Sequence, residues 1–330
     1  MTMVTSNQDT VMVVIGRNEG DRLVRCLQSV RGQTACVIYV DSASQDQSVA
    51  HAQRLGAEVV ALDMSLPFSA ARARNAGWRH ALQLHPDARY VQFVDGDCEV
   101  FPNWVSSARQ VLEQQPDVVA VCGRRKERFP DASVYNRMCD IEWNTPVGEA
   151  RSVGGDAMFR ARAMLDSGGY RDDVIAGEEP ELCVRLRQAG GKILRIDADM
   201  TLHDAAILRW SQWWTRSKRG GYAFALGAHL HGAEPERHWV AEYRRALLWG
   251  LLLPVTLLTL AIWAPLAALV ASLIYPLQLI RLKLKSPPSA GIGWRYAALT
   301  LMTKAAEAQG CARFWRERLQ GSTPTIIEYK

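Results

Sequence analysis

Short apolar runs alternate with longer amphipathic segments along the first hundred residues of the chain. The apolar runs are VMVVI, CVIYVD, EVVALD and YVQFVD, and the segments between them are DRLVRCLQSV, QSVAHAQRL and AARARNAGWRHAL. Buried strands that alternate with amphipathic helices are typical of a parallel β-sheet with helices on both faces. The pattern therefore predicts an α/β domain that begins near Val11 and extends at least to Asp97.

Beyond this region the pattern becomes mixed and then strongly apolar. It predicts a helix from Val105 to Glu113, a strand at DVVAVCG, a glycine-rich turn at VGGDAMF, a helix at PELCVRLRQAG and a strand at KILRI. The next segment, ILRWSQWWTRSKRGGYAFALG, is expected to be a helix that carries both aromatic and basic residues.

The stretch from Ala246 to Ile280 contains no charged residue. It is too long for one membrane span of about 20 residues and slightly short for two full spans. Basic residues flank both ends, and positive flanks tend to remain on the cytoplasmic side. We therefore expect a helical hairpin with both ends at one membrane face. The alternative is a buried helical pair in a soluble core, although soluble helices normally show a polar face that is missing here.

The distribution of charge and cysteine indicates which partner the chain binds and which compartment it occupies. Residues 1–234 hold 27 Lys and Arg against 29 Asp and Glu, whereas residues 235–330 hold 12 against 5. Because the excess positive charge flanks the apolar stretch, it indicates an anionic membrane surface rather than nucleic acid, for which no binding motif is visible. The 7 cysteines are scattered without a Cys-x-x-Cys pair, which fits a reducing compartment. No cleavable signal peptide is visible at the N-terminus, so we expect the N-terminal domain in the cytoplasm.

Polar side chains follow the predicted strands at the points where they end. Asn18 and Glu19 follow the first, Asp41 ends the second, and Asp95 and Asp97 follow the fourth. Ligands of such sheets bind beyond the carboxyl ends of the strands. A glycine between the last two carboxylates permits a tight turn, and hard oxygen ligands of this kind suit Mg²⁺ or Mn²⁺. An Asp-x-Asp also occurs in many solvated turns, so it does not establish a metal site alone.

Five motifs together resemble the family 2 glycosyltransferases of the GT-A fold, in order and in spacing. They are VVIGRNE, YVDSASQDQS, FSAARARNAG, FVDGDCEV and GEEPELCVRLRQAG, and the resemblance covers about residues 11–230. It implies a Rossmann-like GT-A domain that binds a nucleotide-diphosphate sugar, UDP- or GDP-linked, together with Mn²⁺ or Mg²⁺.

The resemblance also implies roles for residues of the nucleotide pocket. Asn18 and Glu19 would line it, Asp41 would contact the base or ribose, and Asp95 would bind on the ribose side. Arg72 and Asn75 would lie near the nucleotide and its phosphates. The simpler interpretation of that helix is an exposed face, which we favour for Arg74, and Asp46 has the alternative of capping the following helix.

For catalysis, the resemblance assigns Glu179 as the base that takes the acceptor's proton, with Glu178 beside it near the donor sugar. An acidic helix N-terminus stabilised by the helix dipole explains Glu178, Glu179 and Glu181 equally simply. Asp156 would support the donor sugar, although a Gly-Gly-Asn turn is typical of the family and a carboxylate cannot donate a hydrogen bond.

The departing diphosphate requires positive charge. By resemblance Asp97 and His203 would hold the metal, while Arg216 and Arg219 would clamp phosphates or contact lipid headgroups. The Gln-x-x-Arg-Trp motif of processive synthases is absent here, so we expect a single, non-processive transfer.

The hypothesis is an inverting, metal-dependent glycosyltransferase that acts on a lipid-linked or polysaccharide acceptor at the cytoplasmic face of the inner membrane. The alternatives are a nucleotidyltransferase, for which GRNEGDR is a poor phosphate loop, and an idle sugar-nucleotide-binding scaffold. We expect the GT-A domain at residues 1–232, the membrane hairpin with basic flanks at 233–290, and a C-terminal amphipathic helix and tail at 291–330.

Overall fold

The computed structural model describes residues 8–287, 291–322 and 324–328. The chain divides into two compact units, which are described separately. The first comprises Met1–Arg128 and Glu142–Ala205, and the second Phe129–Ile141 and Ala206–Lys330. The predicted domain boundary at 232 thus lies inside the second unit, which also takes in a short segment of the predicted first domain.

The first unit is built on one mixed sheet, in which nine strands are found within the described residues. They are β1 (Thr10–Gly16), β2 (Cys36–Asp41), β3 (Glu58–Ala61), β4 (Tyr90–Asp95), β5 (Cys98–Val100), β6 (Val118–Glu127), β7 (Gly148–Glu149), β8 (Ala157–Arg160) and β9 (Lys192–His203). The strand order is β3-β2-β1-β4-β8-β6-β9-β5, and β7 pairs with β9. The predicted α/β class is confirmed, and the first four strands are parallel as expected.

The second half of the sheet is where antiparallel pairs enter. β8 runs antiparallel to both β4 and β6, and β5 runs antiparallel to β9. Both β6 and β9 extend well beyond the apolar runs DVVAVCG and KILRI that predicted them. Their polar continuations lack the alternation that marks a strand, but pairing between these two strands satisfies the backbone there. This extension carries His203 to the register of Cys98.

Helices of the first unit cover the sheet. They are α1 (Asp21–Val30), α2 (Ser48–Arg54), α3 (Ala70–Leu84), α4 (Trp104–Gln114), α6 (Ala161–Ser167) and α7 (Glu178–Gln188). α1 buries Leu23, Cys26, Leu27 and Val30, which is the spacing of one helical face. α3 begins where the Ser69 side chain accepts a hydrogen bond from the backbone N–H of Arg72, so the hydroxyl caps its first turn.

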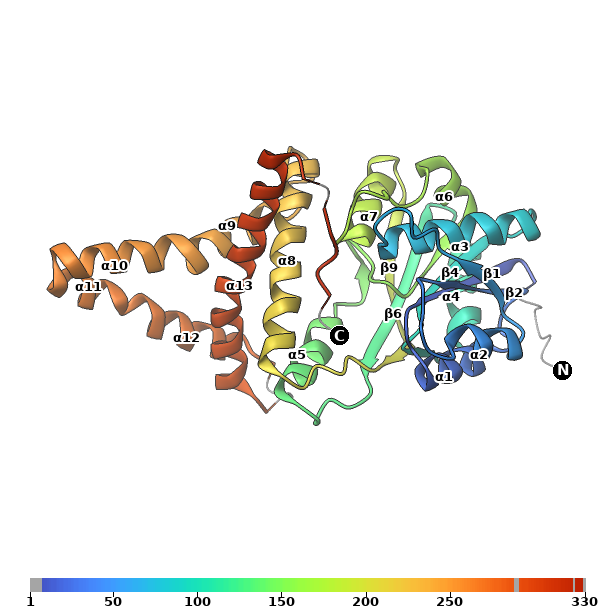
Figure 1. Ribbon diagram of the computed structural model, residues 1–330, viewed down its shortest axis with the longest axis horizontal. Helices are drawn as coiled ribbons and strands as arrows, with labels where there is room; N and C mark the ends of the chain where they lie inside the picture. The colour runs from blue at the N-terminus through green and yellow to red at the C-terminus, as the bar shows by residue number, and fades with distance from the viewer. Residues whose placement is uncertain (1–7, 288–290, 323, 329–330) are drawn as a thin grey trace. The chain divides into compact units, whose positions relative to one another are not determined.

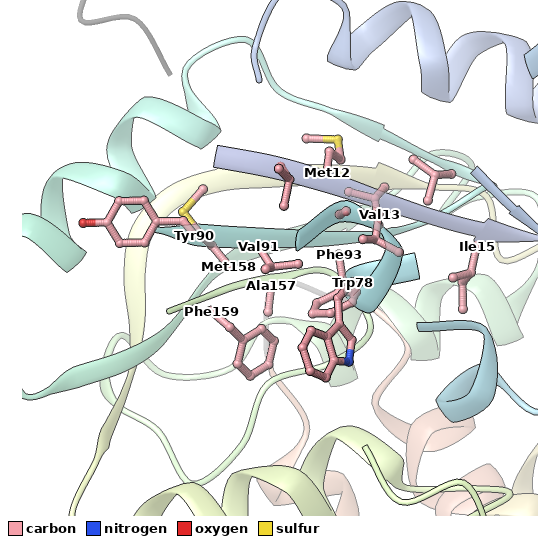
Figure 2. Close-up of a cluster of buried hydrophobic side chains, with 14 of the residues drawn as sticks. Met12, Val13, Ile15, Trp78, Tyr90, Val91, Phe93, Ala157, Met158 and Phe159 are labelled. Atoms are coloured by element: carbon pink, nitrogen blue, oxygen red, sulfur yellow. The ribbon is translucent and has the colours of Figure 1, made fainter. Parts of the chain in front are cut away.

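The core lies between the strands and these helices. Figure 2 shows side chains of β1, β4 and β8 gathered with the indole of Trp78 from α3. Val11 to Val14 of β1 are fully buried, because a central parallel strand is covered on both faces. Phe93 packs edge-on against both Phe159 and Tyr170, with ring centroids 5.7 and 5.3 Å away. The carboxyl ends of β1, β2 and β4 are thereby held on a rigid frame.

The second unit is helical. Its elements are most of α5 (Val134–Trp143), followed by α8 (Trp210–His231), α9 (Val240–Leu247), the π-turn η1 (Leu248–Leu252), α10 (Leu253–Trp263), α11 (Pro265–Ser272), α12 (Ile274–Lys285) and α13 (Gly293–Gln320). Figure 1 shows α8 and α13 side by side, with α10 leading out and α11 and α12 leading back as a hairpin. This π-helical turn accommodates Pro254, whose ring in a regular α-helix would clash with the carbonyl group of Gly250.

The hairpin is long and apolar enough to cross a membrane, by length and composition. The two candidate spans are Val240–Trp263 and Pro265–Lys285. A core helix of a soluble protein passes the same test, but only 6% of either apolar window is buried in the structure. Leu258, Ile262 and Trp263 are exposed by 68%, 77% and 81%. The predicted helical hairpin is therefore present, and its side chains do not form a soluble core.

Candidate functional site

The loops after β1 and β2 are tied together at the carboxyl edge of the sheet. The Asn18 backbone N–H donates to the Ser44 hydroxyl at 2.9 Å, and the Asn18 side-chain oxygen accepts from the Gln45 N–H at 2.7 Å. Asn18 takes a left-handed backbone conformation, with φ of 57°, which asparagine tolerates better than most residues. These hydrogen bonds hold the two loops together, and residues 17–20 and 41–47 form one rim at this edge of the sheet.

Acidic residues of this rim brace the loops. Asp41 is almost buried; its carboxylate accepts from the Tyr39 hydroxyl at 3.0 Å and from the Ser44 N–H at 2.9 Å. Glu19 forms an ion pair with Arg22 at 2.8 Å. Asp46 accepts from the Ser48 N–H at 2.9 Å, but the N-cap of α2 is Gln47, so Asp46 supports the turn before the helix and is not its N-cap residue.

Asp97 and His203 meet at a second part of the edge. The two side chains are nearly buried, and His203 Nε2 lies 3.2 Å from Asp97 Oδ1. Pairing of β5 with β9 brings them together, and the Trp143 ring packs edge-on against the imidazole with centroids 4.7 Å apart. Neighbouring ligands of an octahedral ion at ~2.1 Å lie about 3 Å apart, so this separation fits a shared Mg²⁺ or Mn²⁺.

Cys98 completes a cluster whose ligand atoms lie within 4.8 Å of one another. Burial raises the pKa of the Cys98 thiol well above its usual value. A neutral thiol is a poor ligand for a hard ion. The carboxylate and the imidazole are therefore the groups of this cluster that could hold such an ion.

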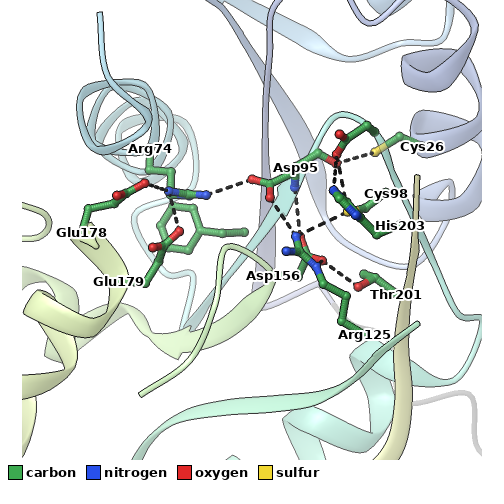
Figure 3. A network of polar contacts seen from close by, with 12 residues as sticks. Cys26, Arg74, Asp95, Cys98, Arg125, Asp156, Glu178, Glu179, Thr201 and His203 are labelled. Carbon is green, nitrogen blue, oxygen red and sulfur yellow. Dashed lines mark hydrogen bonds and ion pairs between the residues drawn. The ribbon is translucent and has the colours of Figure 1, made fainter. Parts of the chain in front are cut away.

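Two arginines hold the Asp95 carboxylate from opposite sides (Figure 3). Arg74 Nη2 donates to Asp95 Oδ1 at 2.8 Å, and Arg125 Nη2 donates to Asp95 Oδ2 at 2.8 Å. Behind them Asp156 is fully buried and accepts from the Asp95 N–H at 3.0 Å, from Arg125 Nε at 2.8 Å and from the Thr201 hydroxyl at 2.6 Å. Asp156 thus orients both Asp95 and Arg125, and its predicted contact with a donor sugar stays a prediction.

The acidic start of α7 contacts the same network. Arg74 Nη1 lies 3.0 Å from Glu178 Oε1 and 2.8 Å from Glu179 Oε1. The Glu178 side chain is 4% exposed and that of Glu179 12%. Glu181 instead pairs with Arg185 on its own helix at 2.7 Å. The three acids are therefore not equivalent, and the helix-terminus explanation alone does not account for the contacts of the first two.

These contacts set opposite pKa shifts at the site. Burial, and then the charge of Glu178, raise the pKa of Glu179 to about 7 against the opposing effect of Arg74. Burial also raises the pKa of Asp95, but the guanidinium groups of Arg74 and Arg125 outweigh it, and that pKa lies below its usual range. At neutral pH Asp95 is charged, whereas Glu179 is able to take up and release a proton.

Of the other predicted site residues, two form hydrogen bonds to backbone carbonyls and two lie in the second unit. Arg72 donates to the carbonyls of Asp63, Leu66 and Pro67. Asn75 is buried and donates to the Tyr170 carbonyl at 2.7 Å. Their predicted contacts with the nucleotide and its phosphates stay predictions. Arg216 and Arg219 belong to α8 of the second unit, and their predicted role at the diphosphate also stays a prediction.

The structure corrects one expectation and adds one residue. Arg74 was expected on an exposed helix face, but it is 2% exposed and paired with three carboxylates. Arg125 was not predicted, because it lies on a strand extension without a hydrophobic pattern. Gly155 leaves space for this cluster, since a Cβ there would lie 2.6 Å from Arg74 Nη2 and 2.7 Å from Asp95 Oδ2.

The sequence was also compared with known families and proteins. The sequence model of the family described as Glycosyl transferase family 2 matches residues 11–154. Over 140 residues the chain is 29% identical to a TPR repeat-containing protein of Synechococcus elongatus, covering 41% of this chain and 32% of that protein. Over 119 residues it is 26% identical to the glucosyl-dolichyl phosphate glucuronosyltransferase of Haloferax volcanii, covering 31% of this chain and 38% of that protein. The chain thus spans about a third of the length of these curated relatives.

The fold is also similar to that of solved structures. The mannosyltransferase PcManGT from Pyrobaculum calidifontis, solved in complex with GDP-Man and Mn²⁺, superposes with a TM-score of 0.62 at 17% identity. The likeness covers 95% of this chain and 89% of that one. The predicted GT-A fold class is therefore confirmed.

Proposed function

Because residues 11–154 match the sequence model of glycosyl transferase family 2, we propose that this chain is an inverting glycosyltransferase. It takes a sugar from a UDP- or GDP-linked donor and transfers it to a lipid-linked or glycan acceptor. In the transfer, an acceptor hydroxyl oxygen attacks the anomeric carbon of the sugar as the bond to the diphosphate breaks. The hydroxyl proton passes to a carboxylate of the enzyme, and the nucleoside diphosphate leaves.

The observation that carries this proposal is the environment of Glu179. Its carboxylate is more accessible than that of Glu178, and its pKa of about 7 allows it to accept a proton at neutral pH. It is linked through Arg74 to Asp95, the residue proposed to bind the ribose side of the nucleotide. One side chain therefore holds both the proposed base and the residue proposed to bind the nucleotide, which supports transfer from a nucleotide sugar.

Asp97 and His203 would hold the Mn²⁺ or Mg²⁺ ion, whose charge offsets that of the departing diphosphate. Asn18, Glu19 and Asp41 would form the rim that receives the nucleotide, which is consistent with the hydrogen bonds that join their loops. Asp156 and Glu178 would act on the donor-sugar side, Asp156 through its hydrogen bond to the backbone of Asp95.

The hairpin would attach the enzyme to the cytoplasmic face of the inner membrane, with Arg216 and Arg219 near phosphates. Two exposed apolar helices support attachment, and the basic residues at both ends support a cytoplasmic position for the flanks. A membrane-bound enzyme meets a lipid-linked acceptor without diffusion through the cytoplasm.

The experiment is donor turnover by the full chain in lipid vesicles, with a panel of UDP- and GDP-sugars and with Mn²⁺ or Mg²⁺. Glu179→Gln is expected to retain donor binding and to lose transfer by roughly 10² to 10⁴-fold, because the amide cannot take a proton. Glu178→Gln, the matched control, is expected to lose less. Asp97→Asn is expected to abolish the response to metal and to weaken nucleoside diphosphate binding.

Each alternative gives a distinct result. A fully active Glu179→Gln enzyme would exclude this base, and full metal-dependent turnover by Asp97→Asn would exclude the metal site. Donor binding without any turnover across the panel indicates an idle scaffold. Release of pyrophosphate from a nucleoside triphosphate indicates a nucleotidyltransferase.

A further inference from the structure

Arg74 lies at the centre of the carboxylate cluster of the first unit (Figure 3). Its guanidinium contacts Asp95 through Nη2 at 2.8 Å, and both Glu178 and Glu179 through Nη1 at 3.0 and 2.8 Å. The side chain is 3% exposed, and it lies over the Tyr170 ring at 5.7 Å from the centroid. One buried cation therefore joins three acids that come from two different elements, β4 and α7.

We propose that Arg74 is a positioning residue that keeps the Glu179 carboxylate charged and directed toward the donor site, and so sets the pH at which transfer begins. This inference rests on the proposed function, in which Glu179 is the base. Arg74 itself does not contact the reacting atoms in this arrangement. It acts through the carboxylate that it holds.

The geometry requires an arginine. A planar guanidinium presents several N–H donors in a fixed fork, so two nitrogens reach three carboxylates at once. A lysine ammonium is a single point that is unable to reach both ends of this span. Space for the fork is provided by Gly155, since a Cβ at that position would lie 2.6 Å from Arg74 Nη2.

The charge balance around Glu179 gives the sign of the effect. The groups that act on it from the surrounding elements are Glu178 and Cys183 of α7, Asp95 of β4, Tyr170 of the preceding loop, and Arg74 of α3. Burial and the carboxylates of Glu178 and Asp95 raise the pKa of Glu179, and Arg74 lowers it. Removing Arg74 therefore raises this pKa above its value of about 7, and the base is protonated at neutral pH.

The test is the pH profile of kcat for the full chain in lipid vesicles. In wild type we expect kcat to rise with pH through about 7. In Arg74→Gln the rise is expected at a pH about one to three higher, the usual effect of an opposite charge at this distance. If the rise in kcat moves up by one pH unit, the rate at neutral pH falls about tenfold. The rate of the variant recovers in alkaline buffer. Arg74→Lys, which keeps the charge but not the fork, is expected to fall between the two.

A second variant moves the profile the other way. Glu178→Gln removes a like charge and leaves Nη1 of Arg74 to Glu179, so the rise is expected at lower pH than in wild type. This variant keeps the test informative if the Arg74 variants fail to fold, which thermal melting reports.

Two outcomes would contradict the proposed role of Arg74 and leave the proposed function unaffected. One is a folded Arg74→Gln enzyme whose rate is reduced equally at every pH. The other is a Glu178→Gln profile that coincides with that of wild type. A fully active Glu179→Gln enzyme would instead overturn the proposed base, and the role of Arg74 with it.

Discussion

Asp95 and Glu179 both contact Arg74, yet their carboxyl groups lie in opposite electrostatic environments. Asp95 has a second arginine on its other oxygen, which holds its pKa below the usual range despite burial. Glu179 shares the guanidinium of Arg74 with Glu178 and Asp95. Burial and the charge of Glu178 therefore outweigh the effect of Arg74, and the pKa of Glu179 is raised to about 7. Carboxylates whose pKa values are driven apart are suited to different tasks. One network therefore holds a carboxylate that is charged at neutral pH and another that takes up and releases a proton there.

Asp156 provides a prediction about a position at which the sequence departs from the family pattern. An asparagine is typical of the family at this turn, but here the carboxylate is fully buried and pairs with Arg125 Nε at 2.8 Å. Asp156→Asn keeps the shape and leaves Arg125 without this charge partner. We expect it to lower the free energy of unfolding by about 3 kcal/mol, the scale for breaking a buried pair. Thermal and denaturant unfolding of the variant measure this.

The matched control is Asp166→Asn, which removes a carboxylate from an exposed pair with Arg162. We expect a change below about 1 kcal/mol, because solvent screens such pairs. If Asp156→Asn is as stable as this control and alters only donor-sugar preference, the carboxylate serves the sugar rather than Arg125.

How far the sequence predicts the site depends on the kind of residue. Asp97 and His203 were expected to share a metal, and they lie 3.2 Å apart. The acids at strand ends are found because parallel strands bring their carboxyl ends to one edge. Arg74 was misassigned because a helical pattern records which positions are buried only when they are apolar. A buried arginine is stabilised by carboxylates that come from distant segments of the chain, and no local pattern contains them.

At the scale of elements, close packing joins α8 and α13. A Cβ at Gly221 of α8 would lie 2.0 Å from the Glu307 carbonyl oxygen, and one at Gly310 of α13 would lie 2.0 Å from that of Lys218. Glycines at the crossing let the two backbones approach closely. The sequence predicts α13 as an amphipathic helix, but not its partner, because a glycine gives no sign of which helix approaches it.

Adjacent glycines of α8 give a matched pair of substitutions. Gly221→Ala forces the two helices apart, and we expect it to destabilise the second unit by about 1 to 3 kcal/mol, as overpacking does. Gly220→Ala meets nothing within 4 Å, so it is expected to stabilise by about 0.5 to 1 kcal/mol through helix propensity. Thermal melting of both variants tests the sign. Equal effects would show that α8 and α13 do not pack in this way.

At the scale of the whole molecule, the hairpin interrupts a helical unit instead of following it. α8 and α9 precede the hairpin, and α13, which packs on α8, comes after it. Truncating the chain before Arg244 would therefore remove α13 and expose the face of α8 that it covers. Trp249 and Tyr275 mark a place where the two arms of the hairpin meet, since their ring centroids are 5.7 Å apart. A deletion beyond this contact removes the apolar tip and keeps both helices of the unit.

We therefore expect the tip and the flanks to contribute separately to membrane binding. Replacing residues 252–272 with a short Gly-Ser linker removes eight of the fifteen exposed large apolar side chains between Leu248 and Leu284, and leaves Arg244, Arg245, Lys283 and Lys285 in place. Flotation with anionic vesicles measures the result.

The intact chain is expected to float at low and high salt, because burial of apolar side chains in the bilayer does not depend on salt. The deletion variant is expected to float at low salt and much less at high salt, because a larger share of its remaining attraction is electrostatic and is screened by ions. It is also expected to keep nucleotide binding, since the first unit is unchanged. If the deletion variant floats at high salt as fully as the intact chain, the apolar tip is not the anchor.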